Sequence, residues 1–197
     1  MAILTHALDD LLATPQPDVA SRLLYDWWQR KRGDRPMPGR GELDPGELKS
    51  ILPTMLIIGV ERAASSPALT FVCRLAGTEI DSRLGLKLTG LTLDAAPIGE
   101  ERDTIRRQYE TAVREKRPIF CSHNIVVNDD RYVEYDRMVV PLADERGEVT
   151  TLVAAVDFHC AYPIERGRPP DCTRPGYCDR VDRCLARRPV AGYPGGA

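Results

Sequence analysis

The chain has 197 residues, of which 43% are hydrophobic and 28% charged, and its formal net charge is −2. This length and composition predict one soluble globular domain with short extensions. A net charge so close to zero argues against nucleic acid or an anionic membrane as a partner, because both attract basic proteins.

The N-terminal residues and the cysteines indicate the compartment. No apolar run approaches the roughly 18 residues of a membrane span. Residues 1–17 carry acidic side chains and lack the long apolar run of a secretory signal, so we interpret them as an N-terminal arm. We therefore expect a cytoplasmic protein, in which the six cysteines are thiols or metal ligands and do not form a disulfide framework.

Residues 18–53 form a predicted helical extension. The segment from Asp18 to Arg32 has the spacing of an amphipathic helix, with Asp18 as N-cap. A second, short helix is expected over 44–52. The apolar side of the first helix has two interpretations: packing on the core of this chain, or contact in a homodimer, because aromatic residues are enriched at interfaces. The residues concerned are Leu23, Leu24, Trp27 and Trp28.

The next segment, within residues 54–160, predicts two strands and a small cap. Strands are expected at 55–60 and from Thr70 to the break at Ala76-Gly77. Thr78 can cap a short helix over 79–84, and Gly85 can end it because glycine adopts a left-handed backbone without strain. A concave cap over a sheet follows from this arrangement.

The rest of the domain predicts one long helix and a meander. Residues 100–116 form a charged helix with a narrow apolar stripe that includes Tyr109. Three strands then follow at 119–127, 132–142 and 149–158, joined by short turns, and such strands pair antiparallel. The predicted fold class is α+β with a single antiparallel sheet.

Four motifs in this order resemble the PAS domain family. They are Tyr25 with Trp28, LDPGELKSILP at 43–53, RLAGTEI at 74–80 and LTG at 88–90; the hairpin PLADERGEVTTLVAAVDF at 141–158 also resembles the end of that fold. The set is similar to a bacterial subfamily of short proteins that carry little besides the sensor domain. The resemblance covers about residues 18–158. It implies five antiparallel strands with short helices and one longer helix on one face, above a small pocket.

The resemblance implies a sensor that binds a small ligand or partner protein and forms a homodimer, with another protein reading its state. It implies no flavin or haem: an Asn-Cys-Arg-Phe-like run is replaced by GTEIDSRLG, and the 100–116 helix has no histidine. A structural dimerisation module with an empty pocket is the alternative. No enzyme activity is expected, because the Gly-x-Ser-x-Gly, phosphate-loop and His-Glu-x-x-His motifs are absent.

Candidate ligand-binding residues lie mainly on the predicted strands. Cys121 and His123 share a strand face about 6–7 Å apart, too far for a direct nucleophile–base contact. A buried structural role is the alternative for each, and for Cys73. Both faces of the next strand mix polar and apolar residues, so the pocket side stays open. Tyr135, Arg137 and Arg74 have two interpretations of equal weight: a polar patch for an anionic or hydroxylated ligand, or a solvated ion-pair surface. The candidates are Arg74, Tyr109, Cys121, His123, Tyr135 and Arg137.

Residues 161–197 form a tail rich in cysteine, proline and arginine. Cys172, Cys178 and Cys184 are each separated by five residues, and Cys160 precedes them. Regularly spaced thiols favour Zn²⁺ or, less readily, an iron–sulfur cluster, although structural zinc sites usually have shorter spacings. Unliganded thiols in the tail are the interpretation that we place first, a metal site comes second, and disulfides formed on purification come last. A metal- or redox-responsive protein is therefore a further hypothesis.

Overall fold

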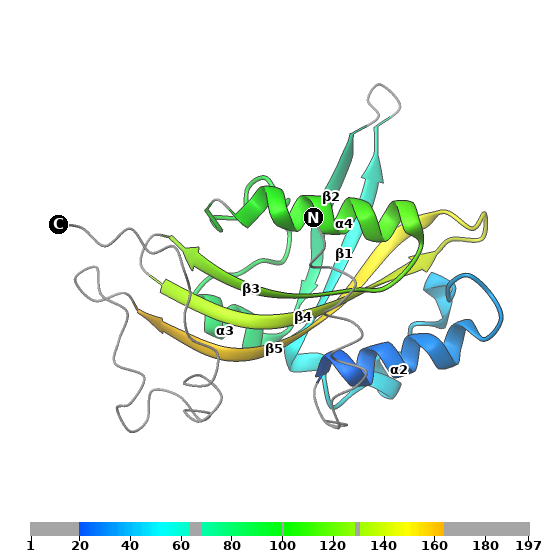
Figure 1. Cartoon of the computed structure of the whole chain (residues 1–197), viewed down its shortest axis with the longest axis horizontal. Helices are drawn as coiled ribbons and strands as arrows, with labels where there is room; N and C mark the ends of the chain where they lie inside the picture. Colours follow the sequence, from blue (N-terminus) through cyan, green and yellow to red (C-terminus); the bar gives the residue numbers. More distant parts are fainter. Residues whose placement is uncertain (1–19, 64–67, 100, 129–130, 164–197) are drawn as a thin grey trace.

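The computed structural model describes residues 20–63, 68–99, 101–128 and 131–163, with side chains up to residue 159. In this part of the chain, five strands form one antiparallel sheet in the order β2-β1-β5-β4-β3 (Figure 1). The predicted fold class is thus confirmed. The strands are β1 (Met55–Arg62), β2 (Leu69–Ala76), β3 (Ile119–Val127), β4 (Arg131–Ala143) and β5 (Val149–Pro163).

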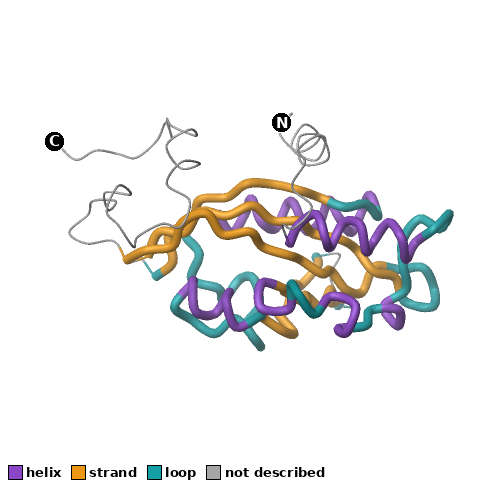
Figure 2. Tube along the Cα trace, turned by 90° about the horizontal axis from the view of Figure 1, so that it is seen from below, coloured by secondary structure: helices purple, strands orange, loops and turns teal. Residues whose placement is uncertain are grey.

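Helices cover both faces of this sheet. They are α2 (Ala20–Arg32), α3 (Thr78–Leu84) and α4 (Glu101–Glu115). In β5, Val156 lines a pocket together with side chains of α3 and α4, whereas the next residue, Asp157, contacts α2. Successive strand residues point to opposite faces, so α2 lies on the face opposite α3 and α4. In Figure 2 the strands form a curved layer through the described part of the chain.

Helix α2 is held against the sheet by burial and by two polar contacts. Leu24, Trp27 and Trp28 are 0%, 1% and 3% exposed, and Trp28 Nε1 donates a 2.8 Å hydrogen bond to the carbonyl oxygen of Pro141. The two oxygens of Asp157 accept from the amides of Ala20 and Ser21 at 2.7 and 2.9 Å. The carboxylate therefore satisfies amides that a helix N-terminus leaves unpaired.

The tryptophan side of α2 belongs to the core of this chain. Of the four residues considered for a dimer interface, only Leu23 is partly exposed; Leu24, Trp27 and Trp28 are in the same hydrophobic cluster as the sheet. The assignment of these three side chains to a dimer contact is wrong for this structure, because their surface is already covered by the sheet. Packing on the core, the other interpretation, accounts for them.

Two local predictions about helix ends need correction. The expected helix over 44–52 is instead two 3₁₀ turns, η2 (Pro45–Leu48) and η3 (Leu52–Thr54), after η1 (Arg40–Glu42). Thr78 is the first residue of α3 and does not cap it, because Gly77 occupies the N-cap position. A Cβ at Gly77 would lie 2.2 Å from the carbonyl oxygen of Pro53, so close packing requires glycine here.

The connector from 85 to 99 covers the α3/α4 side of the sheet. Gly85 ends α3 with a φ of 70°, as predicted. The connector then lies along the edge of β2: Leu91 accepts from the Cys73 amide at 2.9 Å, and the Leu93 amide donates to Phe71 at 2.8 Å. These bonds cover part of an exposed strand edge and form one wall of the pocket described next.

Within the described residues, no helix combines the length and apolar character needed to cross a membrane.

Candidate functional site

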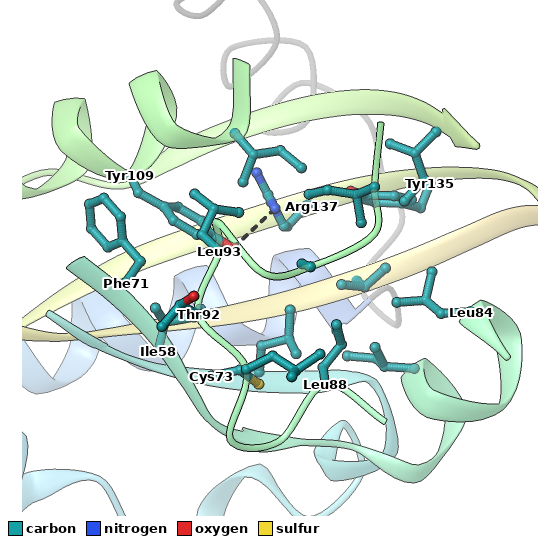
Figure 3. Close-up of a pocket in the computed structure, with 18 of the residues that line it drawn as sticks. Ile58, Phe71, Cys73, Leu84, Leu88, Thr92, Leu93, Tyr109, Tyr135 and Arg137 are labelled. Carbon is teal, nitrogen blue, oxygen red and sulfur yellow. Dashed lines mark hydrogen bonds between the residues drawn. The ribbon is translucent and has the colours of Figure 1, made fainter. Parts of the chain in front are cut away.

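A small cavity lies between the sheet, α3, α4 and the 85–99 connector. Its free volume is about 80 Å³, several times the roughly 10–15 Å³ that one water molecule requires. Figure 3 shows Arg137 and Tyr135 on one side and Cys73, Leu84 and Leu88 on the other. Most of the wall is apolar. It consists of Leu56, Ile58, Phe71, Cys73, Ile80, Leu84, Leu88, Leu91, Thr92, Leu93, Ala96, Ile98, Ile105, Tyr109, Ile125, Tyr135, Arg137, Val156 and Phe158.

Arg137 provides the one permanent charge in this wall. Its side chain comes from the middle of β4 and is only 2% exposed. Nη2 donates to Gln108 Oε1 at 2.6 Å and Nη1 donates to the Tyr109 hydroxyl at 3.2 Å, the bond drawn in Figure 3. The guanidinium also lies over the Tyr109 ring, 5.0 Å from its centroid. Helix α4 therefore supplies hydrogen-bond acceptors and an aromatic face to this cation.

His123 extends the polar group behind the pocket. Its Nε2 lies 3.0 Å from Gln108 Oε1 and 3.3 Å from Arg137 Nη2, and its ring stacks on Tyr135 with 5.2 Å between centroids. Burial, and then the Arg137 cation, lower the pKa of His123 from 6.5 to about 3. The imidazole is therefore neutral at neutral pH and adds no charge beside the guanidinium.

The thiols and phenols around the pocket are protonated at neutral pH. Burial, with a smaller contribution from Asp81, raises the pKa of the Cys73 thiol to about 11. Burial also raises the pKa of Cys121, Tyr109 and Tyr135. None of these groups is an activated nucleophile, because activation requires a lowered pKa or an adjacent base. The site is suited to binding by shape, hydrogen bonds and one cation.

The structure brings together five of the six predicted ligand-binding residues. Tyr109, Tyr135 and Arg137 line the cavity, which settles which face of β4 is the pocket side. Cys121 and His123 are buried on the same side; Cys121 lies beside Arg137, and His123 is hydrogen-bonded.

Arg74 does not belong to this site. Its side chain is 55% exposed and forms an ion pair with Glu61 at the surface. A register irregularity between β1 and β2 places Arg74 opposite no residue of β1 and lays its side chain over Gly59. The predicted patch of Arg74 with Tyr135 and Arg137 is therefore wrong for Arg74. The solvated ion pair, the other interpretation, fits this residue.

Sequence reasoning missed Gln108 and most of the connector. Gln108 is 5% exposed and belongs to the buried stripe of α4 with Ile105 and Ala112. Gln108 falls on the apolar side of this helix at the 3.6-residue period, so its burial could have been predicted from the sequence. Residues 91–98 form a connector that follows neither a helical nor a strand pattern, so no periodic signal marks them as part of the pocket.

The cysteine side chains of the metal hypothesis lie outside the described residues. The backbone of Cys160 lies in β5, but its side chain is outside the described residues, as are Cys172, Cys178 and Cys184. Within the described part of the chain, no group of three or more histidine, cysteine, aspartate or glutamate side chains is arranged to hold a metal ion.

Comparison with known proteins supports the fold. A family model described as PAS domain matches residues 17–156. No curated protein sequence matches the chain.

Several solved structures resemble the chain at low identity. A sensory box sensor histidine kinase of Vibrio cholerae is 18% identical, with a TM-score of 0.39 over 57% of this chain and 84% of that one. A PAS domain of a Colwellia psychrerythraea protein is 10% identical, with a TM-score of 0.42 over 57% and 93%. The PAS domain of Bordetella pertussis BvgS is 13% identical, with a TM-score of 0.41 over 54% and 76%.

Proposed function

The chain belongs to the PAS domain family, and from that premise we propose that it is a sensory domain that binds a small molecule in the cavity beneath α3 and α4. The observation that carries this proposal is the cavity itself, because well-packed interiors contain few voids larger than a water molecule. Its apolar wall and single buried cation have the composition of a ligand site, where a few polar groups orient a mostly apolar ligand.

Strand β5 connects the pocket to helix α2. Val156 and Phe158 line the cavity, and Asp157 between them caps α2 on the opposite face. A ligand that moves this part of β5 changes the position of the carboxylate that holds Ala20 and Ser21. The sensory state is thus transmitted to α2, where a partner protein can read it.

Native mass spectrometry of the full chain tests ligand binding. The wild type should carry an adduct that denaturing conditions remove. Ala96→Leu fills the cavity, since Ala96 is 6% exposed and lines it, and should lose the adduct. Ala95→Leu is the matched control, because the neighbouring Ala95 is exposed, and should keep it.

The alternative, a structural module with an empty pocket, predicts different results. The wild type would then show its bare mass, and Ala96→Leu would be more stable than the wild type because it fills an unused void. Greater stability of Ala96→Leu without any adduct in the wild type would overturn the sensory proposal.

Homodimerisation, a signalling partner and a cytoplasmic location stay predictions, as do the absence of enzyme activity and of nucleic-acid or membrane binding.

The described residues include a second apolar groove around Leu43, Leu52 and Ile57, beside Leu75, which is 42% exposed. This groove is the place to test association: Leu75→Glu should shift the oligomeric state, measured by light scattering, if the surface joins two copies.

A further inference from the structure

Arg137 carries a charge that the described protein does not neutralise. All the side chains in contact with its guanidinium are neutral at neutral pH: Gln108, Tyr109, Cys121 and His123. No carboxylate of the described residues forms an ion pair with Arg137. The acidic residues near this network are Glu101, whose Oε2 lies 3.7 Å from His123 Nδ1, and Asp136, which acts on His123 and Cys121. Arginine does not lose its proton in proteins, so the site holds an unpaired buried cation.

The guanidinium also has an unused donor. Arg137 Nε is buried and has no hydrogen-bond partner, whereas Nη1 and Nη2 are engaged by α4. Buried donors are nearly always satisfied, and leaving one unsatisfied is costly. Arg137 lines the cavity, so a molecule that occupies the cavity lies beside this guanidinium and can supply it with an acceptor.

The cavity limits the size of that molecule. Its free volume of about 80 Å³ compares with the roughly 30 Å³ that one water molecule takes up in the liquid. The occupant is therefore a small molecule, and a carboxylate on it leaves room for only a short alkyl tail. In Figure 3, Leu84 and Leu88 lie on the side of the cavity away from Arg137, and most of the wall is apolar.

We propose that this pocket binds a short-chain monocarboxylate, with its carboxylate on Arg137 and its alkyl tail against Leu84, Leu88 and Phe158. This inference rests on the proposed sensory function and specifies the ligand class. One negative charge balances one cation, and a carboxylate oxygen accepts from Nε in the geometry that arginine favours. A dicarboxylate would leave its second charge against the apolar wall, where nothing solvates it.

Calorimetric titration of the full chain at pH 7 tests the ligand class with four probes: pentanoate, pentanamide, pentan-1-ol and pentanedioate. Pentanoate should bind at least about tenfold more tightly than pentanamide, which has the same shape without the charge. Pentanedioate should bind at least about tenfold more weakly than pentanoate. Arg137→Met should abolish the preference for pentanoate over pentanamide, and Arg74→Met, the matched change at an exposed arginine, should keep it.

A second measurement, made on the wild type, reports on Arg137 directly and is independent of whether Arg137→Met folds. In wild-type protein labelled with ¹⁵N, the Arg137 Nε–H resonance should shift on addition of pentanoate and stay in place with pentan-1-ol. An unchanged resonance at saturating pentanoate would overturn the inference.

The outcomes separate the ligand class from the sensory function. If pentanamide or pentan-1-ol binds as tightly as pentanoate, the carboxylate assignment is wrong while a ligand-binding pocket stands. If no probe binds but the purified chain carries an adduct, the ligand belongs to another class. If no probe binds and the chain shows its bare mass, both proposals fail.

Discussion

The two faces of the sheet differ in how they use their covering helices. On one face, α2 places Leu24, Trp27 and Trp28 on the sheet, and its N-terminus is held by Asp157. On the other, α3, α4 and the connector leave a cavity of about 80 Å³ with a buried cation in its wall. Dense packing provides stability, whereas a void and an unpaired charge weaken it. The comparison supports the proposal that the α3/α4 face binds a ligand, whereas the α2 face holds the domain together.

Truncation on each face gives the largest expected effect. Trp27→Ala should lower the free energy of unfolding by about 3–5 kcal/mol, because it leaves a large hole in a closely packed layer. Leu84→Ala, at the pocket wall, should cost less, about 2–3 kcal/mol, because a short helix beside a void can move to fill part of the space. Urea denaturation measures both. Equal losses would contradict the contrast between the two faces.

Acidification should lower the stability of the fold, because His123 on the α3/α4 side becomes protonated. The pKa of His123 is depressed from 6.5 to about 3 in the folded chain, so the unfolded chain binds the proton more tightly. Stability is therefore complete above pH 6.5 and is lost as the pH falls toward 3, by up to about 1.4 kcal/mol per pH unit. Nearby Asp136 and Glu101 favour the protonated ring and oppose this loss, and Arg137 reinforces it.

Urea denaturation between pH 7 and 4 checks this prediction. His123→Gln should flatten the pH dependence, since glutamine keeps a neutral hydrogen-bonding side chain. His6 and His159 remain in that variant, so the difference between the two profiles reports His123 alone. Parallel profiles would show that His123 titrates normally.

Removing the cap on α2 tests the connection between the faces. Asp157→Ala should lower the free energy of unfolding by about 1–2 kcal/mol, because two helix amides lose their carboxylate. Asp157→Asn should retain part of this stability, since its amide oxygen still accepts a hydrogen bond. Amide hydrogen exchange at Ala20 and Ser21 should be faster in both variants. Unchanged exchange rates would show that Asp157 of β5 does not stabilise the start of α2. That result would weaken the proposed transmission of the ligand-bound state from β5 to α2.

The smallest effect is expected at Arg74. Arg74→Ala removes an ion pair with Glu61 in which both side chains are at least half exposed, and such pairs contribute about 0–1 kcal/mol. Binding at the pocket should not change, because Arg74 does not line it. A more than tenfold loss of ligand affinity in Arg74→Ala would show that Arg74 contributes to the binding site.

Local patterns were sufficient for the strands and the family. The apolar runs predicted β1, β3 and β4 to within one or two residues at each end, and the left-handed Gly85 followed from its place after a short helix. Such features depend on neighbours in sequence, whose spacing is readable from the chain. Strand alternation also places Tyr135 and Arg137 on one face of β4 and Tyr132 and Asp136 on the other.

Which face became the pocket was decided only by tertiary structure. The choice depends on which helix covers each face. Both α2 and α4 pack on β4 and β5, but β1, β2 and α3 lie between the two helices in the sequence. The pairing of Arg137 with Gln108 and the capping of α2 by Asp157 span 29 and 137 residues. The sequence by itself therefore determined the strands, the fold class and a set of candidates. Packing across the sheet selected among them, because contacts between distant segments have no period in the chain.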